Sequence, residues 1–149
     1  MVAPSSANQL QVTDSNLYYT DGQQLISVAL TCVNSDNCLD SQQVLADQVV
    51  PLTMMHVRND RLVYTAYANN PNTDRIVMLL DLTCVPDCQP QPIVNNAMAG
   101  LLSPDGDYLM IDSLDAGVNI LDISGGSVVY MTHTLGGQLQ TVIFTSPRR

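Results

Sequence analysis

Short runs of alternating apolar and polar residues, separated by turn residues, recur along the chain. In the clearest run, at residues 25–32, Ile26, Val28 and Leu30 alternate with side chains of the opposite face. A period of two residues is typical of a β-strand, and the Asn, Asp, Gly and Pro residues between the runs favour turns. The pattern therefore predicts an all-β chain of short antiparallel strands.

The best-defined group of strands lies at residues 99–137. Ser103-Pro104-Asp105-Gly106 separates its first two apolar runs, because Pro presets the first turn position and Gly accepts a positive φ. A third run at 118–123 ends on two glycines, and a fourth run follows at 127–132. This order predicts a four-stranded meander.

The same order of four strands recurs upstream at intervals of about 40 to 50 residues, which is the period of propeller blades. We therefore predict a partial β-propeller: about three four-stranded antiparallel blades and the first strand of a fourth. The predicted units are a flexible leader at 1–8, blade one at 9–48, blade two at 49–98, blade three at 99–137 and a partial blade four at 138–149. A β-sandwich of short strands is the alternative, since it has similarly frequent turn signals.

Blade two has two special strands. Its first strand is predicted over residues 49–57, and its fourth over 90–94. Pro90 and Pro92 mark the fourth strand as an edge, because proline cannot donate a ladder hydrogen bond.

The four cysteines form two close pairs, Cys32 with Cys38 and Cys84 with Cys88, each after a predicted third strand. Two local disulfides at hairpin tips explain this spacing and require an oxidising compartment. A four-thiolate zinc site is an alternative, although neither spacing is the usual two-residue knuckle. Free buried thiols in a reducing cytosol are another. We predict the disulfides, and with them an extracellular, cell-surface or periplasmic location.

Charge limits the classes of partner. The chain has 149 residues, 5 basic and 14 acidic, for a net charge of −9. Such a surface repels phosphate backbones and anionic lipids, so we expect no nucleic-acid partner. We also expect no membrane insertion, because no apolar run reaches about 18 residues. Residues 1–8 lack the basic and apolar regions of a signal peptide.

The sequence carries no catalytic signature, so we predict that the chain is not an enzyme and needs no cofactor. Ser127 follows two glycines but lacks the second glycine of a nucleophile elbow. His56 and His133 fall in different predicted blades. We expect both at blade surfaces or edges, since metal or acid–base chemistry needs partners at fixed geometry.

Two further groups of residues have a binding and a structural interpretation. Acidic side chains around the turn offer oxygen ligands for calcium, but turn aspartates more often accept backbone hydrogen bonds. These are Asp105, Asp107, Asp112 and Asp115. Tyrosines on inner strands offer a binding face, but cross-strand packing between blades is the stronger expectation. These are Tyr18, Tyr19, Tyr64, Tyr67, Tyr108 and Tyr130.

Residues 99–126 resemble the repeat of TolB-like β-propellers. The resemblance rests on Ser103-Pro104-Asp105-Gly106, followed by Tyr108-Leu109-Met110-Ile111 and by the strand at 118–123. It covers about one blade, and the chain has no Trp of the kind that marks Trp-Asp propellers. The resemblance implies a disc of radial four-stranded sheets, usually periplasmic or extracellular, that binds proteins or sugars or shields an enzyme.

A propeller blade buries its faces only against neighbouring blades, and closed rings hold about four to eight of them. Three blades would leave apolar faces uncovered at both ends. We therefore predict a protein partner that completes the ring: a second copy of this chain, as in a homo-oligomer, or other segments of the same assembly. The expected function is that of a non-enzymatic extracellular scaffold or protein-interaction module. The alternatives are an accessory propeller of a secreted hydrolase or peptidase, and a carbohydrate-binding propeller.

Overall fold

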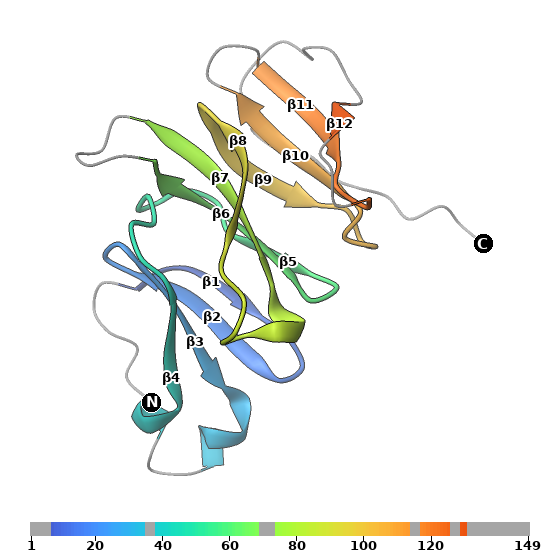
Figure 1. The fold of residues 1–149 in the computed structure, drawn as a ribbon. Coiled ribbons are helices and arrows are strands. Elements are labelled where there is room, and N and C mark those ends of the chain that lie inside the picture. Colours follow the sequence, from blue (N-terminus) through green and yellow to red (C-terminus); the bar gives the residue numbers. More distant parts are fainter. Residues whose placement is uncertain (1–6, 35–37, 69–73, 114–116, 126–128, 131–149) are drawn as a thin grey trace.

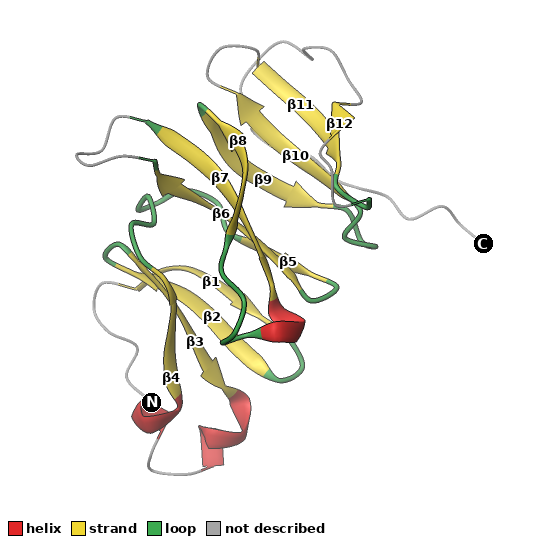
Figure 2. Cartoon of the chain, viewed as in Figure 1, coloured by secondary structure: helices red, strands yellow, loops and turns green. Residues whose placement is uncertain are grey.

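The computed structural model describes residues 7–34, 38–68, 74–113, 117–125 and 129–130. Within these residues the chain forms three four-stranded antiparallel sheets, which follow one another in chain order (Figure 1). Apart from strands and loops, it contains short 3₁₀ turns (Figure 2). The predicted all-β class is confirmed.

In each sheet the spatial order of the strands is their order in the sequence. The first sheet contains β1 (Ala7–Val12), β2 (Asn16–Asp21), β3 (Gln24–Ala29) and β4 (Gln42–Ala46). The second contains β5 (His56–Arg58), β6 (Arg61–Tyr67), β7 (Arg75–Asp81) and β8 (Gln91–Asn95). The third contains β9 (Ala97–Leu102), β10 (Tyr108–Ser113), β11 (Gly117–Asp122) and β12 (Val129–Tyr130). The 3₁₀ helices are η1 (Leu30–Asn34), η2 (Cys38–Ser41) and η3 (Leu82–Cys84).

Some boundaries differ from those expected from the sequence. β1 begins at Ala7, inside the predicted leader. The strand expected over 49–57 is wrong for most of its length, because only β5 forms there. Leu52 has a φ of 62°, a left-handed conformation that strands do not contain, and it follows a proline. The predicted partial blade at 138–149 lies outside the described residues.

The first two sheets pack face to face. Tyr18 and Leu25 of the first sheet share one hydrophobic cluster with Leu62, Tyr64 and Leu80 of the second. In Figure 1 the two sheets lie next to each other, with β5 and β6 alongside β1 to β3. This cluster is the core between the first and second sheets.

The second and third sheets pack through a separate cluster. Val63 and Val77 of the second sheet meet Leu109, Ile111 and Leu121 of the third. Neighbouring residues of a strand point to opposite faces. The second sheet therefore uses one face for each neighbour, and five consecutive β6 residues, 62–66, are buried.

Candidate functional site

The predicted turn Ser103-Pro104-Asp105-Gly106 is a compact hydrogen-bonded unit between β9 and β10. The Ser103 hydroxyl donates to the Asp105 carboxylate and accepts from the Tyr108 N–H at 2.9 Å. Asp105 Oδ1 also accepts from the Asp107 N–H at 3.1 Å, and the Gly106 N–H donates to the Ser103 carbonyl at 2.9 Å. Side chains in the turn thus accept hydrogen bonds from backbone N–H groups between β9 and the start of β10.

The same turn docks on the β5–β6 turn of the second sheet. Asn59 Nδ2 donates to the Asp105 carbonyl at 2.7 Å, and Arg61 Nη1 donates to the Gly106 carbonyl at 2.6 Å. Arg61 Nη1 also lies 3.6 Å from Asp107 Oδ1 in a partly exposed ion pair. The sequence identified the turn at Ser103–Gly106 but not its contact with the second sheet, because the donors and acceptors lie 45 or 46 residues apart.

Gly106 fits this contact through its missing side chain. It has a φ of +77°, and an added Cβ would lie 3.3 Å from the Asn59 Cβ. We expect Gly106→Ala to lower the free energy of unfolding by about 1–2 kcal/mol for the left-handed conformation, plus the cost of displacing Asn59. Gly22→Ala is the matched control, because Gly22 has a φ of +60° with nothing within 4 Å. Equal losses in urea denaturation would show that the inter-sheet contact adds nothing.

Asp105 stabilises this turn by accepting hydrogen bonds within it. Hydrogen bonds from the Ser103 hydroxyl and the Asp107 N–H hold the pKa of Asp105 below its ordinary value. Within the described residues, no group of three or more His, Cys, Asp or Glu side chains is placed to hold a metal ion. Asp115, the fourth member of the proposed calcium cluster, lies outside those residues.

Both predicted cysteine pairs lie at disulfide distance, in the connection between the third and fourth strands of their sheets. The Cα atoms of Cys32 and Cys38 are 4.9 Å apart, and those of Cys84 and Cys88 are 5.4 Å apart. Among the described residues no cysteine is free. The zinc and free-thiol alternatives therefore do not fit this structure.

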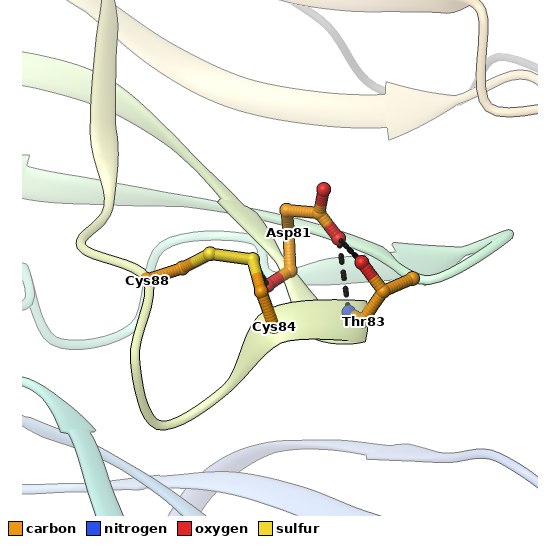
Figure 3. The surroundings of a disulfide bond; sticks show 4 residues. All are labelled: Asp81, Thr83, Cys84 and Cys88. Carbon is orange, nitrogen blue, oxygen red and sulfur yellow. Dashed lines mark hydrogen bonds between the residues drawn. A yellow bond between two sulfur atoms is a disulfide. The ribbon is translucent and has the colours of Figure 1, made fainter.

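Asp81 caps the turn that precedes the Cys84–Cys88 loop, and Asp122 caps the equivalent turn of the third sheet. Asp81 Oδ1 accepts from the Thr83 N–H at 2.9 Å and from its hydroxyl at 2.6 Å, beside the Cys84–Cys88 disulfide (Figure 3). Asp122 caps Ser124 with the same two bonds, of 2.9 and 2.6 Å. These bonds lower the pKa of both carboxyls. The second and third sheets thus end their third strands alike.

His56 and Thr65 join the second sheet to β9. Both are buried, and they accept hydrogen bonds from the backbone of the neighbouring sheet. His56 Nδ1 accepts from the Leu102 N–H, and the Thr65 hydroxyl accepts from the Ala99 N–H, both at 2.9 Å. His56 does lie on an edge strand of its sheet, as expected, but a surface position for it is wrong, because it is buried against β9. His56 is buried because the third sheet packs against it. No residue near His56 in the sequence indicates this contact, since its partner Leu102 lies 46 residues away.

The face of the first sheet that points away from the second, here called the outer face, is largely apolar. By cross-strand pairing its apolar side chains are Leu10, Val12, Leu17, Tyr19, Ile26, Val28 and Val44, and Gln42 lies beside Val28 on the same face. Cys32 and Cys38 pack against its centre. Towards its sides, Leu10, Val12 and Val44 remain 57%, 59% and 51% exposed.

The described tyrosines mainly serve packing. Tyr18 and Tyr64 are buried between the first and second sheets, and Tyr19 is buried on the outer face. Tyr67 and Tyr108 are half-buried. Ser127, His133 and the side chain of Tyr130 lie outside the described residues. No helix in the described ranges is long and apolar enough to span a lipid bilayer.

Neither a protein-family model nor a curated protein sequence matches this chain. Solved structures do match its fold. The N-terminal domain of Nup159 superposes with a TM-score of 0.58 and 12% identity, over 85% of this chain and 30% of that one. A structure from a study of two prolyl endopeptidases superposes with a TM-score of 0.51 and 18% identity, over 82% of this chain and 20% of that one.

Both of these structures are β-propellers in the matched region. The chain is therefore similar in fold to part of a β-propeller. It spans less than a third of either matched chain.

Proposed function

We propose that this chain is a segment of a β-propeller, in which each of the three sheets is one blade, and that it acts as a non-enzymatic scaffold or protein-interaction module. Its outer face is an interface on which a further sheet packs, supplied by a second copy of the chain or by other segments of the same assembly. The observation that carries the proposal is the exposed apolar surface at Leu10, Val12 and Val44.

Comparison of equivalent positions supports this interpretation. The second strands of the three sheets carry Leu17, Leu62 and Leu109 at matching positions. Leu62 and Leu109 are 0% exposed, because each packs against the sheet that precedes its own. Leu17 occupies that position on the outer face, where no described sheet precedes it. A sheet stacked there would bury the apolar side chains and make the first sheet like the others.

The proposed location is extracellular, on a cell surface or in a periplasm. Two disulfides indicate an oxidising setting, since such bonds are rare in reducing compartments. The resemblance of the Ser103–Gly106 turn to the TolB-like repeat also supports this location, because that resemblance implies a periplasmic or extracellular propeller.

A second candidate function is an accessory propeller of a secreted hydrolase or peptidase. The observation that favours it is the superposition with the prolyl endopeptidase structure. Because that match is only 18% identical, it bears on the fold and leaves catalysis to a domain that these residues do not include. A nucleophile-bearing α/β domain in the same open reading frame would decide for this candidate.

The proposal predicts self-association of the isolated chain through the outer face. In sedimentation velocity at micromolar concentration, we expect the wild-type chain to form dimers or larger polymers. The double variant Leu10→Gln, Val12→Thr is expected to shift the mass to one chain, because it removes apolar area that association buries. Thr keeps the β-branched shape that suits a strand.

Leu52→Gln is the matched control, since Leu52 is 75% exposed but lies between the first two sheets in sequence and outside the outer face. It should leave the mass unchanged. A wild-type chain that is monomeric and binds no hydrophobic dye would overturn the proposal that the outer face is an interface.

A further inference from the structure

A cleft of about 550 Å³ opens where the outermost strands of the first and second sheets diverge. This volume is within the range of sites that bind ligands. One wall is residues 43–48, from β4 and the two residues after it. The floor is the face of the second sheet that carries Ile76, Met78 and Leu80. The far wall contains Pro86 and Cys88 of the disulfide-closed loop, and Pro90 and Pro92, which follow it.

The cleft meets β4 along the edge that pairs with no other strand in the described part of the chain. Four consecutive residues of this strand, 43–46, line the cleft, whereas β7 contributes the alternating residues 76, 78 and 80. Alternate residues lie on one face of a strand, so a consecutive run indicates contact with the edge. β4 is the last strand of its sheet and contains no proline or charged residue, so its edge is open to another strand.

The opposite edge is blocked. β8 is the last strand of the second sheet, and it carries Pro92 where the strand borders the cleft. Pro90 lies just before it. Because proline has no N–H, this edge offers fewer hydrogen bonds than β4. An added strand would therefore pair with β4 and rest one of its faces on the floor.

A polar pair lies at the cleft. Tyr64 is only 2% exposed and lines the cleft. Burial and the nearby Asp47 carboxylate raise its pKa, so the phenol remains a hydrogen-bond donor at neutral pH. Asp47 lines the cleft as well and is exposed, and none of the described residues that line the cleft is basic.

We propose that this cleft binds an extended basic peptide of another protein, which adds a strand to the free edge of β4. The peptide places apolar side chains on Ile76, Met78 and Leu80, accepts a hydrogen bond from Tyr64, and brings a Lys or Arg to Asp47. The net charge of −9 favours a basic partner. Main-chain pairing supplies affinity and the floor supplies side-chain selectivity, as in other cases of strand addition.

The site goes beyond the proposed function and does not depend on it. The cleft lies between the first and second sheets, whereas the proposed interface for a further sheet lies on the outer face of the first. A chain that fails to self-associate can still bind the peptide, and a chain that does not bind the peptide can still self-associate.

The test uses a fluorescein-labelled probe, Lys-Val-Thr-Leu-Thr-Val-Lys, in fluorescence anisotropy with the whole chain. We expect saturable binding. Met78→Glu, which places a charge on the apolar floor, should raise Kd by about tenfold or more. Asp47→Asn and Tyr64→Phe should each raise Kd by about two- to fivefold, because each removes one polar contact. Circular dichroism verifies that each variant is folded.

Four controls separate strand addition from general attraction. Asp14→Asn removes the same charge at the β1–β2 turn and should leave Kd unchanged, as should Leu10→Gln with Val12→Thr on the outer face. A probe with N-methylated amides, or with Glu in place of Lys, should not bind. The proposal is overturned if the folded wild-type chain does not bind the basic probe, if Met78→Glu and Asp47→Asn bind like wild type, or if the N-methylated probe binds equally well.

Discussion

Replacing His56 with Phe is expected to lower the free energy of unfolding by about 1–3 kcal/mol, because it leaves the buried Leu102 N–H without an acceptor. In the wild-type chain that N–H donates to His56 Nδ1 at 2.9 Å, across the junction of the second and third sheets. Phe keeps an aromatic ring of similar size, so the loss reports the hydrogen bond and not a cavity. Urea denaturation followed by circular dichroism measures it.

The same contact predicts a dependence on pH. Burial, and to a lesser extent the Arg58 guanidinium, lower the pKa of His56 from its ordinary value of 6.5. The unfolded chain therefore takes up this proton at a higher pH than the folded chain. The stability linked to His56 is fully present above pH 6.5 and decreases as the pH falls below it. A protonated imidazole cannot accept the Leu102 N–H, which gives the trend its structural cause.

His56→Asn is the control that keeps an acceptor without the titration. Its side-chain oxygen is expected to restore part of the stability lost in the Phe variant, while the wild-type loss of stability as the pH falls below 6.5 disappears. If the Phe variant were as stable as wild type, or if the Asn variant kept the pH dependence, the inter-sheet hydrogen bond would not be the source of either effect.

The sequence predicts features that depend on neighbouring residues. Turn chemistry at Ser103-Pro104-Asp105-Gly106 places β9 and β10, and the short cysteine spacings give the disulfides. Pro92 identifies β8 as an edge strand. In each case the physical cause acts over a few residues, so it leaves a readable pattern.

Features that depend on two sheets leave no such pattern. The acceptors His56 and Thr65 lie 46 and 34 residues from their donors, and nothing near them in sequence shows that β9 will pass beside them. The apolar run at 49–57 fits a strand, yet most of it forms a connection between sheets in which Leu52 is 75% exposed. The cleft was also missed, because it exists only where the edges of two sheets diverge.

Leu62→Ala is expected to cost about 2–5 kcal/mol of unfolding free energy, and Leu109→Ala a similar amount, because each leaves a cavity between two sheets. Both side chains are 0% exposed. Leu17→Ala changes the corresponding residue of the first sheet, which is only half-buried, and should cost about 1 kcal/mol or less in the monomeric chain. Urea denaturation of the three variants in the Leu10→Gln, Val12→Thr background keeps self-association from masking the difference.

The three leucines share one repeat position and differ in what lies across from them. If the sheets are stable only as a stack, the loss of unfolding free energy depends on whether a preceding sheet covers the leucine. It is large where a sheet covers the leucine and small where none does. Equal costs at all three positions would instead mean that each sheet has its own core. In the associating wild-type background the Leu17→Ala loss should grow with protein concentration, since a partner sheet on the outer face would bury Leu17 as the first sheet buries Leu62.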